Sequence, residues 1–175
     1  MKKTLLKFAR FPYRKTIDQF DFTAQVDMDE RRIKELMGLS FLDNKENLIF
    51  LAPPGIGKTH LAVAIGMEAI SKGMKTHFIT MSELVSQLRK AEQQENLEKK
   101  IVSFIKPSVL IIDEIDYLNL DTQSAHYLFQ VISKRYERSS IILTSNKGFG
   151  EWGEMVGSEN CYSDVRSPFA SLTYH

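Results

Sequence analysis

The chain has 175 residues, of which 43% are hydrophobic and 26% charged, a profile typical of one soluble globular domain. With 23 basic and 22 acidic side chains, the chain has no large positive net charge that would indicate nucleic-acid binding. Its single cysteine, Cys161, excludes an internal disulfide and a zinc site built from cysteines. The basic opening lacks the apolar run of a signal peptide, and no window is apolar enough to span a membrane. We therefore expect a cytoplasmic protein.

Apolar residues follow helical and strand spacings in alternation along most of the chain. In chain order, the predicted elements are a helix at 28–42, a strand at 47–52, a helix at 58–72, a strand at 75–80, helices at 82–91 and 97–105, a strand at 108–113, a helix at 121–136 and a strand at 140–146. Gly73, Ser82 and Asp121 are the expected caps, and Pro107 ends the helix before it. Strands that alternate with helices predict an α/β fold, in which a parallel sheet is covered by helices on both faces.

The segment APPGIGKTH matches the phosphate-loop spacing GxxxxGK[ST] at every place except the first, where Ala52 replaces glycine. Gly55 and Gly57 allow backbone angles that let successive amide hydrogens converge on phosphate oxygens at the start of a helix. Lys58 would reach the β- and γ-phosphates, and the Thr59 hydroxyl would bind Mg²⁺. An ordinary turn is the alternative, but the position between a buried strand and an amphipathic helix favours a phosphate loop. The predicted nucleotide-binding residues are Pro54, Gly55, Ile56, Gly57, Lys58, Thr59 and His60.

Two carboxylates follow the apolar run VLII, where open α/β sheets bind their ligands. Asp113 would hold the Mg²⁺ shell through water, so Thr59 and Asp113 are the candidate metal ligands. Glu114 would orient or activate the water that attacks the γ-phosphate, so it joins Lys58 and Asp113 as a candidate catalytic residue. Asp116, two residues further on, reads as part of a solvated acidic turn.

A fourth candidate catalytic residue, Asn146, ends the strand ILTSN. It would face the γ-phosphate if its strand neighbours the other two, and a simple turn residue is the alternative. No histidine pair has metal-ligand spacing with a third ligand. The charged run 89–100 predicts a solvated helix face, although its lysines, with Lys106, could contact DNA phosphates. Four phenylalanines are expected to pack in the core or at its edge rather than to stack on bases: Phe8, Phe11, Phe20 and Phe22.

The motifs APPGIGKTHLA, VLIIDEI, SKRYERSS, LTSNK and FGEWGE together resemble those of the IstB family. These proteins are AAA+ ATPases that help insertion-sequence transposition and are related to the DnaC helicase loaders. The resemblance covers 11–158, and FPYRKTIDQFDF is similar to the family's lead-in to the ATPase core. It implies an AAA+ P-loop fold with Lys58 and Thr59 as the Walker A pair, Asp113 and Glu114 as the Walker B pair and Asn146 as the sensor. It also implies ATP and Mg²⁺ as cofactors, and DNA, a transposase and further copies of the chain as partners.

The chain departs from the family pattern at both ends. About ten residues precede the lead-in, where the family usually carries a helical domain. After EWGE the family continues with a helix whose LDR arginine acts on a neighbour's ATP, whereas this chain ends in CYSDVRSPFASLTYH. One permitted set of codons for 160–175, read from the second nucleotide, gives IVIATLDRLLHHSHI. We hypothesise a frameshift at or just before Asn160, which the coding DNA would test.

On this hypothesis the chain has a lead-in at 1–27, an AAA+ core at 28–159 without the C-terminal part of the module, and an out-of-frame, disordered tail at 160–175. Cys161 and Arg166 would then have no role. Three functions stay open: a MgATP-binding helper of transposition, as a truncated copy; a nucleotide-binding remnant that does not hydrolyse; and a DnaC-like helicase loader. Because an arginine from a neighbour is worth ~10³ to 10⁵ in rate, its loss would leave binding with little turnover.

Overall fold

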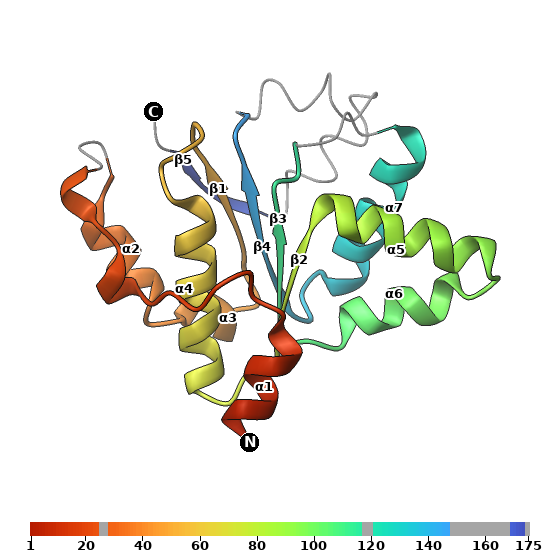
Figure 1. The fold of residues 1–175 in the computed structure, drawn as a ribbon, viewed down its shortest axis with the longest axis horizontal. Helices are drawn as coiled ribbons and strands as arrows, with labels where there is room; N and C mark the ends of the chain where they lie inside the picture. The colour runs from red at the N-terminus through yellow and green to blue at the C-terminus, as the bar shows by residue number, and fades with distance from the viewer. Residues whose placement is uncertain (25–27, 117–120, 148–168, 174–175) are drawn as a thin grey trace.

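A computed structural model describes residues 1–24, 28–116 and 121–147, together with the backbone of 169–173. Its strands form one parallel sheet in the order β2-β3-β4-β1-β5 (Figure 1). The strands are β1 (Asn47–Leu51), β2 (Thr76–Thr80), β3 (Val109–Asp113), β4 (Ser140–Ser145) and β5 (Phe169–Thr173). The first four are the predicted strands, so the α/β class with a parallel sheet is confirmed.

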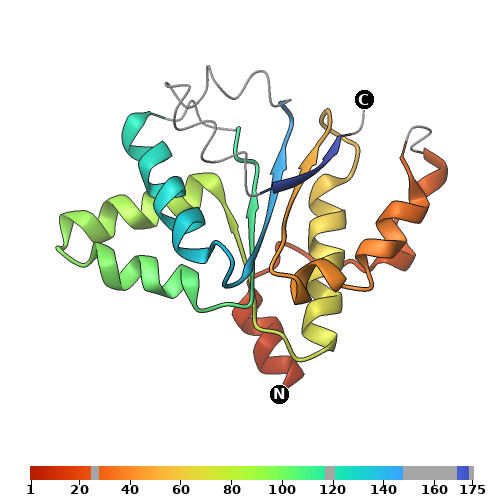
Figure 2. The ribbon, with the colours of Figure 1, turned by 180° about the vertical axis from the view of Figure 1, so that it is seen from behind.

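Helices cover both faces of this sheet. They are α1 (Lys2–Ala9), α2 (Glu30–Leu36), α3 (Ser40–Asp43), α4 (Lys58–Ser71), α5 (Met81–Gln93), α6 (Leu97–Ile105) and α7 (Thr122–Arg135). Helices α2, α3 and α4 lie on one face, and α5, α6 and α7 lie on the other, as the two opposite views show (Figures 1 and 2). In the described part of the chain, no helix is long and apolar enough to cross a membrane.

The central strands are buried on both sides, as their continuous apolar runs predict. In β3, Leu110 and Ile112 join the cluster under α5, α6 and α7, whereas Val109 and Ile111 join the cluster under α4. This division follows from the strand period of two, which sends successive side chains to opposite faces. The sheet therefore separates two apolar cores and holds its strand ends in fixed positions.

Three local predictions are corrected by the structure. The helix expected at 28–42 is two helices, because Leu39 adopts a left-handed conformation (φ 62°) that interrupts the hydrogen-bond ladder. Helix α5 is capped by Thr80 rather than Ser82, since Thr80 Oγ1 accepts from the amide of Glu83 while the Glu83 carboxylate accepts from the amide of Thr80. Tyr136 caps α7 in exposed surroundings instead of extending the buried stripe.

The lead-in segment packs against the core ahead of α2. Phe11 lies on Gly66 of α4, where a Cβ would come within 2.8 Å of its ring, and makes an edge contact with Phe78. Phe20 packs edge-on against Phe22. Phe11, Phe20 and Phe22 are thus partly buried at the edge of the core, in line with the expectation, whereas α1 was not predicted.

The strand β5 differs from the disordered tail expected at 160–175. Its backbone pairs in parallel with β1 over the whole of Phe169–Thr173. The physical reason is that the free edge of β1 offers a row of unpaired N–H and C=O groups, which an extended segment satisfies. The EWGE motif, Cys161 and Arg166 lie outside the described residues, and the frameshift stays a prediction.

Candidate nucleotide-binding site

The phosphate loop connects β1 to α4 at the edge where the strands end. Gly55 and Gly57 have φ angles of 84° and 92°, in the left-handed region that favours glycine. Gly57 also faces Phe20, whose Cε2 would lie 2.7 Å from an added Cβ. The loop thus leads directly into the positive end of α4, which is the arrangement that binds phosphate.

Lys58 begins α4 and turns back into the loop, with only 8% of its surface exposed. Its Nζ donates to the carbonyl oxygens of Ala52 and Pro53 at 2.7 and 2.9 Å, and to Asn146 Oδ1 at 2.6 Å. Burial lowers the pKa of Lys58, while the nearby carboxylates of Asp116, Asp113 and Glu114 oppose this shift. The charged form of a desolvated ammonium that is held by neutral acceptors is stabilised when an anion replaces one of these acceptors.

A chain of hydroxyl and carboxylate groups joins three segments beside this lysine. Thr59 Oγ1 donates to Asp113, with distances of 2.9 and 3.0 Å to its two carboxylate oxygens. Thr144 of β4 donates to the same carboxylate from the other side. Asp113 is 4% exposed and lies behind Thr59, so the structure brings the two predicted metal ligands into direct contact.

Glu114 projects from the end of β3 in a left-handed conformation (φ 55°), which is uncommon for glutamate. Its amide donates to Thr144 Oγ1 at 2.9 Å, and this bond holds the strained residue in place. Partial burial raises the pKa of the Glu114 carboxyl, and Asp113 and Asp116 raise it further while Lys58 lowers it. The exposed carboxylate is therefore a better proton acceptor than an ordinary surface glutamate.

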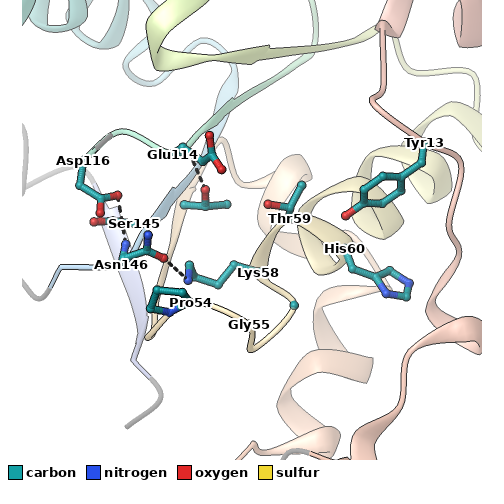
Figure 3. Close-up of a pocket in the computed structure, with 12 residues that line it drawn as sticks. Tyr13, Pro54, Gly55, Lys58, Thr59, His60, Glu114, Asp116, Ser145 and Asn146 are labelled. Carbon is teal, nitrogen blue, oxygen red and sulfur yellow. Dashed lines mark hydrogen bonds between the residues drawn. The ribbon is translucent and has the colours of Figure 1, made fainter. Parts of the chain in front are cut away.

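Asn146 follows β4 and reaches the phosphate loop, as the neighbouring positions of β4 and β1 require. Its side-chain Oδ1 accepts from Lys58 Nζ, and its backbone amide donates to Asp116 Oδ1 at 3.0 Å (Figure 3). Asp116 lies in a turn, as expected, but it is partly buried and its bond to Asn146 was not predicted. Sheet order makes the contact possible, because β3, β4 and β1 are adjacent and end at the same edge.

These groups surround a cavity of about 310 Å³. Its lining includes five predicted nucleotide-binding residues beyond Lys58, namely Pro54, Gly55, Gly57, Thr59 and His60, together with Glu114 and Asn146. The side chain of Ile56 packs on the apolar cluster under α4 instead, which leaves its backbone as the part available to a phosphate. Among the described residues, no three or more His, Cys, Asp or Glu side chains are grouped closely enough to hold a metal ion.

Four further residues line the cavity without having been predicted as site residues: Tyr13, Asp116, Thr144 and Ser145. Thr144 and Ser145 had a weak signal, since both are hydroxyl residues in an otherwise apolar strand, and Asp116 was expected only as part of an acidic turn. Tyr13 comes from the lead-in and lines the cavity near Thr59 and His60 (Figure 3). The lead-in is held there by His60, whose Nε2 lies 2.9 Å from the carbonyl oxygen of Thr16. No local pattern links Tyr13 to a loop so far away in the sequence.

A phosphate loop after β1, an acidic end on β3 and a polar residue at the end of β4, which lies between them in the sheet, define the AAA+ class of P-loop fold. Comparison with known sequences then places the chain within that class. Residues 1–165 match the family described as IstB-like ATP binding protein, and the chain belongs to this family.

Two relatives illustrate the match. A protein of Geobacillus stearothermophilus, named as an ATP-binding protein of insertion sequence IS5376, is 68% identical over 155 residues. One of Pseudomonas aeruginosa, named for insertion sequence IS21, is 47% identical over 152 residues. The matches cover 89% and 87% of this chain and 62% and 57% of the two relatives. The chain therefore spans about 60% of the length of these relatives.

Solved structures share the fold at low sequence identity. The DnaC helicase loader aligns over 99% of both chains, with a TM-score of 0.70 and 21% identity. The replication initiator DnaA bound to AMPPCP and single-stranded DNA aligns over 95% of this chain and 51% of its own, with a TM-score of 0.76 and 17% identity. These similarities confirm the predicted AAA+ P-loop fold.

Proposed function

We propose that the chain is the MgATP-binding part of an insertion-sequence transposition helper that works on DNA with a transposase and with further copies of itself, in the cytoplasm. The observation that carries the proposal is the contact of the phosphate loop with the ends of β3 and β4 through Lys58, Asn146 and Asp113. Family membership and the names of the relatives support the insertion-sequence setting.

The phosphate tail of ATP would lie along the loop, with its oxygens accepting from backbone amides at the start of α4. Lys58 would exchange its bonds to the Ala52 and Pro53 carbonyls for bonds to the β- and γ-phosphates. This exchange replaces neutral acceptors with charged ones, which form the stronger hydrogen bonds.

The contact between Thr59 and Asp113 suits Mg²⁺, because a hydroxyl and a carboxylate are oxygen ligands of the kind this ion prefers. Thr59 Oγ1 would bind the ion directly, and Asp113 would accept from water in its shell. When bound, Mg²⁺ would neutralise charge on the β- and γ-phosphate oxygens. Thr144, which donates to Asp113, keeps the carboxylate in the orientation that this role needs.

For hydrolysis, Glu114 would accept a proton from the attacking water as its oxygen bonds to the γ-phosphorus. The bond from that phosphorus to the β–γ bridging oxygen breaks, and ADP and phosphate leave. Asn146 would donate from its side-chain Nδ2 to a γ-phosphate oxygen, while its side-chain Oδ1 keeps the contact with Lys58. Each group is supplied by a different segment, so turnover requires the order of β3, β4 and β1 seen here.

The test measures ATP binding by titration calorimetry, with and without Mg²⁺, and phosphate release. We expect Glu114→Gln to bind ATP within about threefold of wild type while phosphate release falls by roughly 10² or more. Glu46→Gln, an exposed glutamate before β1, is the matched control and should change neither. Binding without turnover in the wild type would instead identify a non-hydrolysing nucleotide-binding protein, and absence of ATP binding would refute the proposal.

A further inference from the structure

The edge where the strands begin, opposite the phosphate loop, carries a concentration of cations. Two cavities lie there, of about 480 and 280 Å³. The larger is enclosed by α1, β2, α5 and α6, and the smaller is lined by residues directly before β1, β2, β3 and β4. We call this edge the strand-start face and define it by its lining cations, Lys7, Arg10, Lys45, Lys100, Lys106 and Arg138.

The charge of this face departs from the composition of the chain. Six lysine and arginine side chains line the two cavities against one carboxylate, Asp43, although the whole chain has 23 basic and 22 acidic residues. Within the described ranges, the ion pairs involve other residues, such as Arg89 with Asp121 and Lys134 with Glu98. None of the six cations forms an ion pair with a carboxylate in the part of the chain that the structure describes.

Aromatic rings hold some cations of this region in place. The His77 ring lies between those of Phe8 and Phe104, with centroid distances of 5.6 and 5.9 Å. Lys75 Nζ is 4.0 Å from the Phe8 ring centroid, and Lys100 Nζ is 5.7 Å from that of Phe104. Such cation–π contacts fix a lysine without removing its ability to donate to an anion.

Cations of this face also act on the pKa of His77. Burial lowers the pKa of His77, and Arg10 and Lys100 lower it further, while the Phe8 carbonyl and Glu83 act in the opposite direction. Two of the lining cations, Arg10 and Lys100, are therefore close enough to act electrostatically on the imidazole, although burial is the larger cause of the lowered pKa.

We propose that the strand-start face binds the phosphate backbone of DNA. Phosphodiester groups are recognised chiefly by lysine and arginine side chains, and such contacts position a protein without reading bases. The two cavities lie on either side of the end of α6, since Ser103 and Phe104 line one and Ile105 and Lys106 line the other. A continuous backbone can therefore reach cations in both, at the edge of the sheet away from the ATP cavity.

The inference rests on DNA as a partner in the proposed function and adds the surface that contacts it. The test uses fluorescence anisotropy of labelled duplex and single-stranded DNA over a range of salt concentrations. One variant carries Lys100→Gln, Lys106→Gln and Arg138→Gln. The matched control carries Arg31→Gln, Lys34→Gln and Lys90→Gln, which removes the same number of charges from exposed sites outside both cavities.

We expect the first variant to bind duplex DNA roughly 10²-fold more weakly at 0.1 M salt and to reduce the slope of log K against log salt by about 2.7, at 0.9 per lost phosphate contact. The control should stay near wild type, and both should bind ATP normally. Equal losses in the two variants would overturn the inference, as would a labelled oligoglutamate that binds wild type as tightly as DNA. A wild-type chain that binds ATP but no DNA would refute the inference and the DNA partner while leaving nucleotide binding intact.

Discussion

Two buried cations lie at opposite edges of the sheet, and the burial of their charges has different consequences. Lys58, at the edge where strands end, bonds to the Ala52 and Pro53 carbonyls and to Asn146 Oδ1. Arg135, fully buried at the other edge, donates only to backbone carbonyls. Burial lowers the pKa of both groups, that of Arg135 to about 10.

The difference lies in access and in the segments that are joined. Lys58 lines a cavity, so an incoming anion can replace its partners. Arg135 is enclosed and connects the end of α6 to the start of β4, with Nη1 2.9 Å from the Phe104 carbonyl and Nη2 2.8 Å from that of Ser140. A buried charge therefore indicates a binding site only when its partners can be exchanged, and otherwise it stabilises the fold.

The largest effect should come from Arg135→Met. The substitution leaves several buried carbonyls without donors, and we expect the free energy of unfolding to fall by about 3–5 kcal/mol. Urea denaturation measures this loss, with the neighbouring Lys134→Met as the control, because the solvent-exposed pair of Lys134 with Glu98 contributes less than about 1 kcal/mol. A loss as small as the control's would show that Arg135 does not hold the two segments together.

Lys58→Met should have the opposite profile. Removing a desolvated ammonium should change the free energy of unfolding by less than about 1 kcal/mol, whereas ATP affinity should fall roughly 10²-fold because two charge-assisted hydrogen bonds are lost. Denaturation and calorimetry on the same preparation measure both. If stability fell as far as in Arg135→Met, the two cations would be equivalent and the distinction would fail.

The two glycines of the phosphate loop differ in the space around them. Gly57→Ala should destabilise the protein by about 2 kcal/mol, because its φ is positive and the new Cβ meets the Phe20 ring. Gly55→Ala has a similar φ but no atom within 4 Å of the added Cβ, so we expect about 1 kcal/mol. Thermal unfolding measures both, and an equal effect would show that Phe20 simply moves aside.

The smallest effect concerns His77 at the strand-start face. Because its pKa is lowered in the folded state, the unfolded chain binds the proton first as pH falls. Stability should therefore be highest above about pH 6.5, the ordinary histidine value, and should decrease as pH falls from there toward the folded-state pKa. Denaturation between pH 8 and 5 measures this trend, and His77→Gln should remove that part of it. An unchanged slope in the variant would assign the dependence to other groups.

Sequence patterns predicted most of the fold, and the structure confirms the elements with strong local signals. Helix α6 has its predicted bounds, and Asp121 caps α7 by accepting from the amide of Ser124. Errors in element boundaries fall where a single residue decides the boundary, as at Leu39 and Thr80, whereas α1 and β5 were not predicted at all. Most of the predicted site residues line one cavity, and they could be named from the sequence because glycine spacing and an acidic strand end are local features of the chain.

Local patterns in the chain specify the chemical groups at the ends of three strands: the phosphate loop, the Asp113 and Glu114 pair and Asn146. How these ends meet is a property of the folded chain, because the order of parallel strands depends on helix packing between segments distant in the chain. The Lys58 to Asn146 bond spans 88 positions, and the contribution of Tyr13 depends on how the lead-in packs. The sequence also gave no indication that Arg135 connects α6 to β4, because its acceptors are backbone carbonyls, which have no sequence signature.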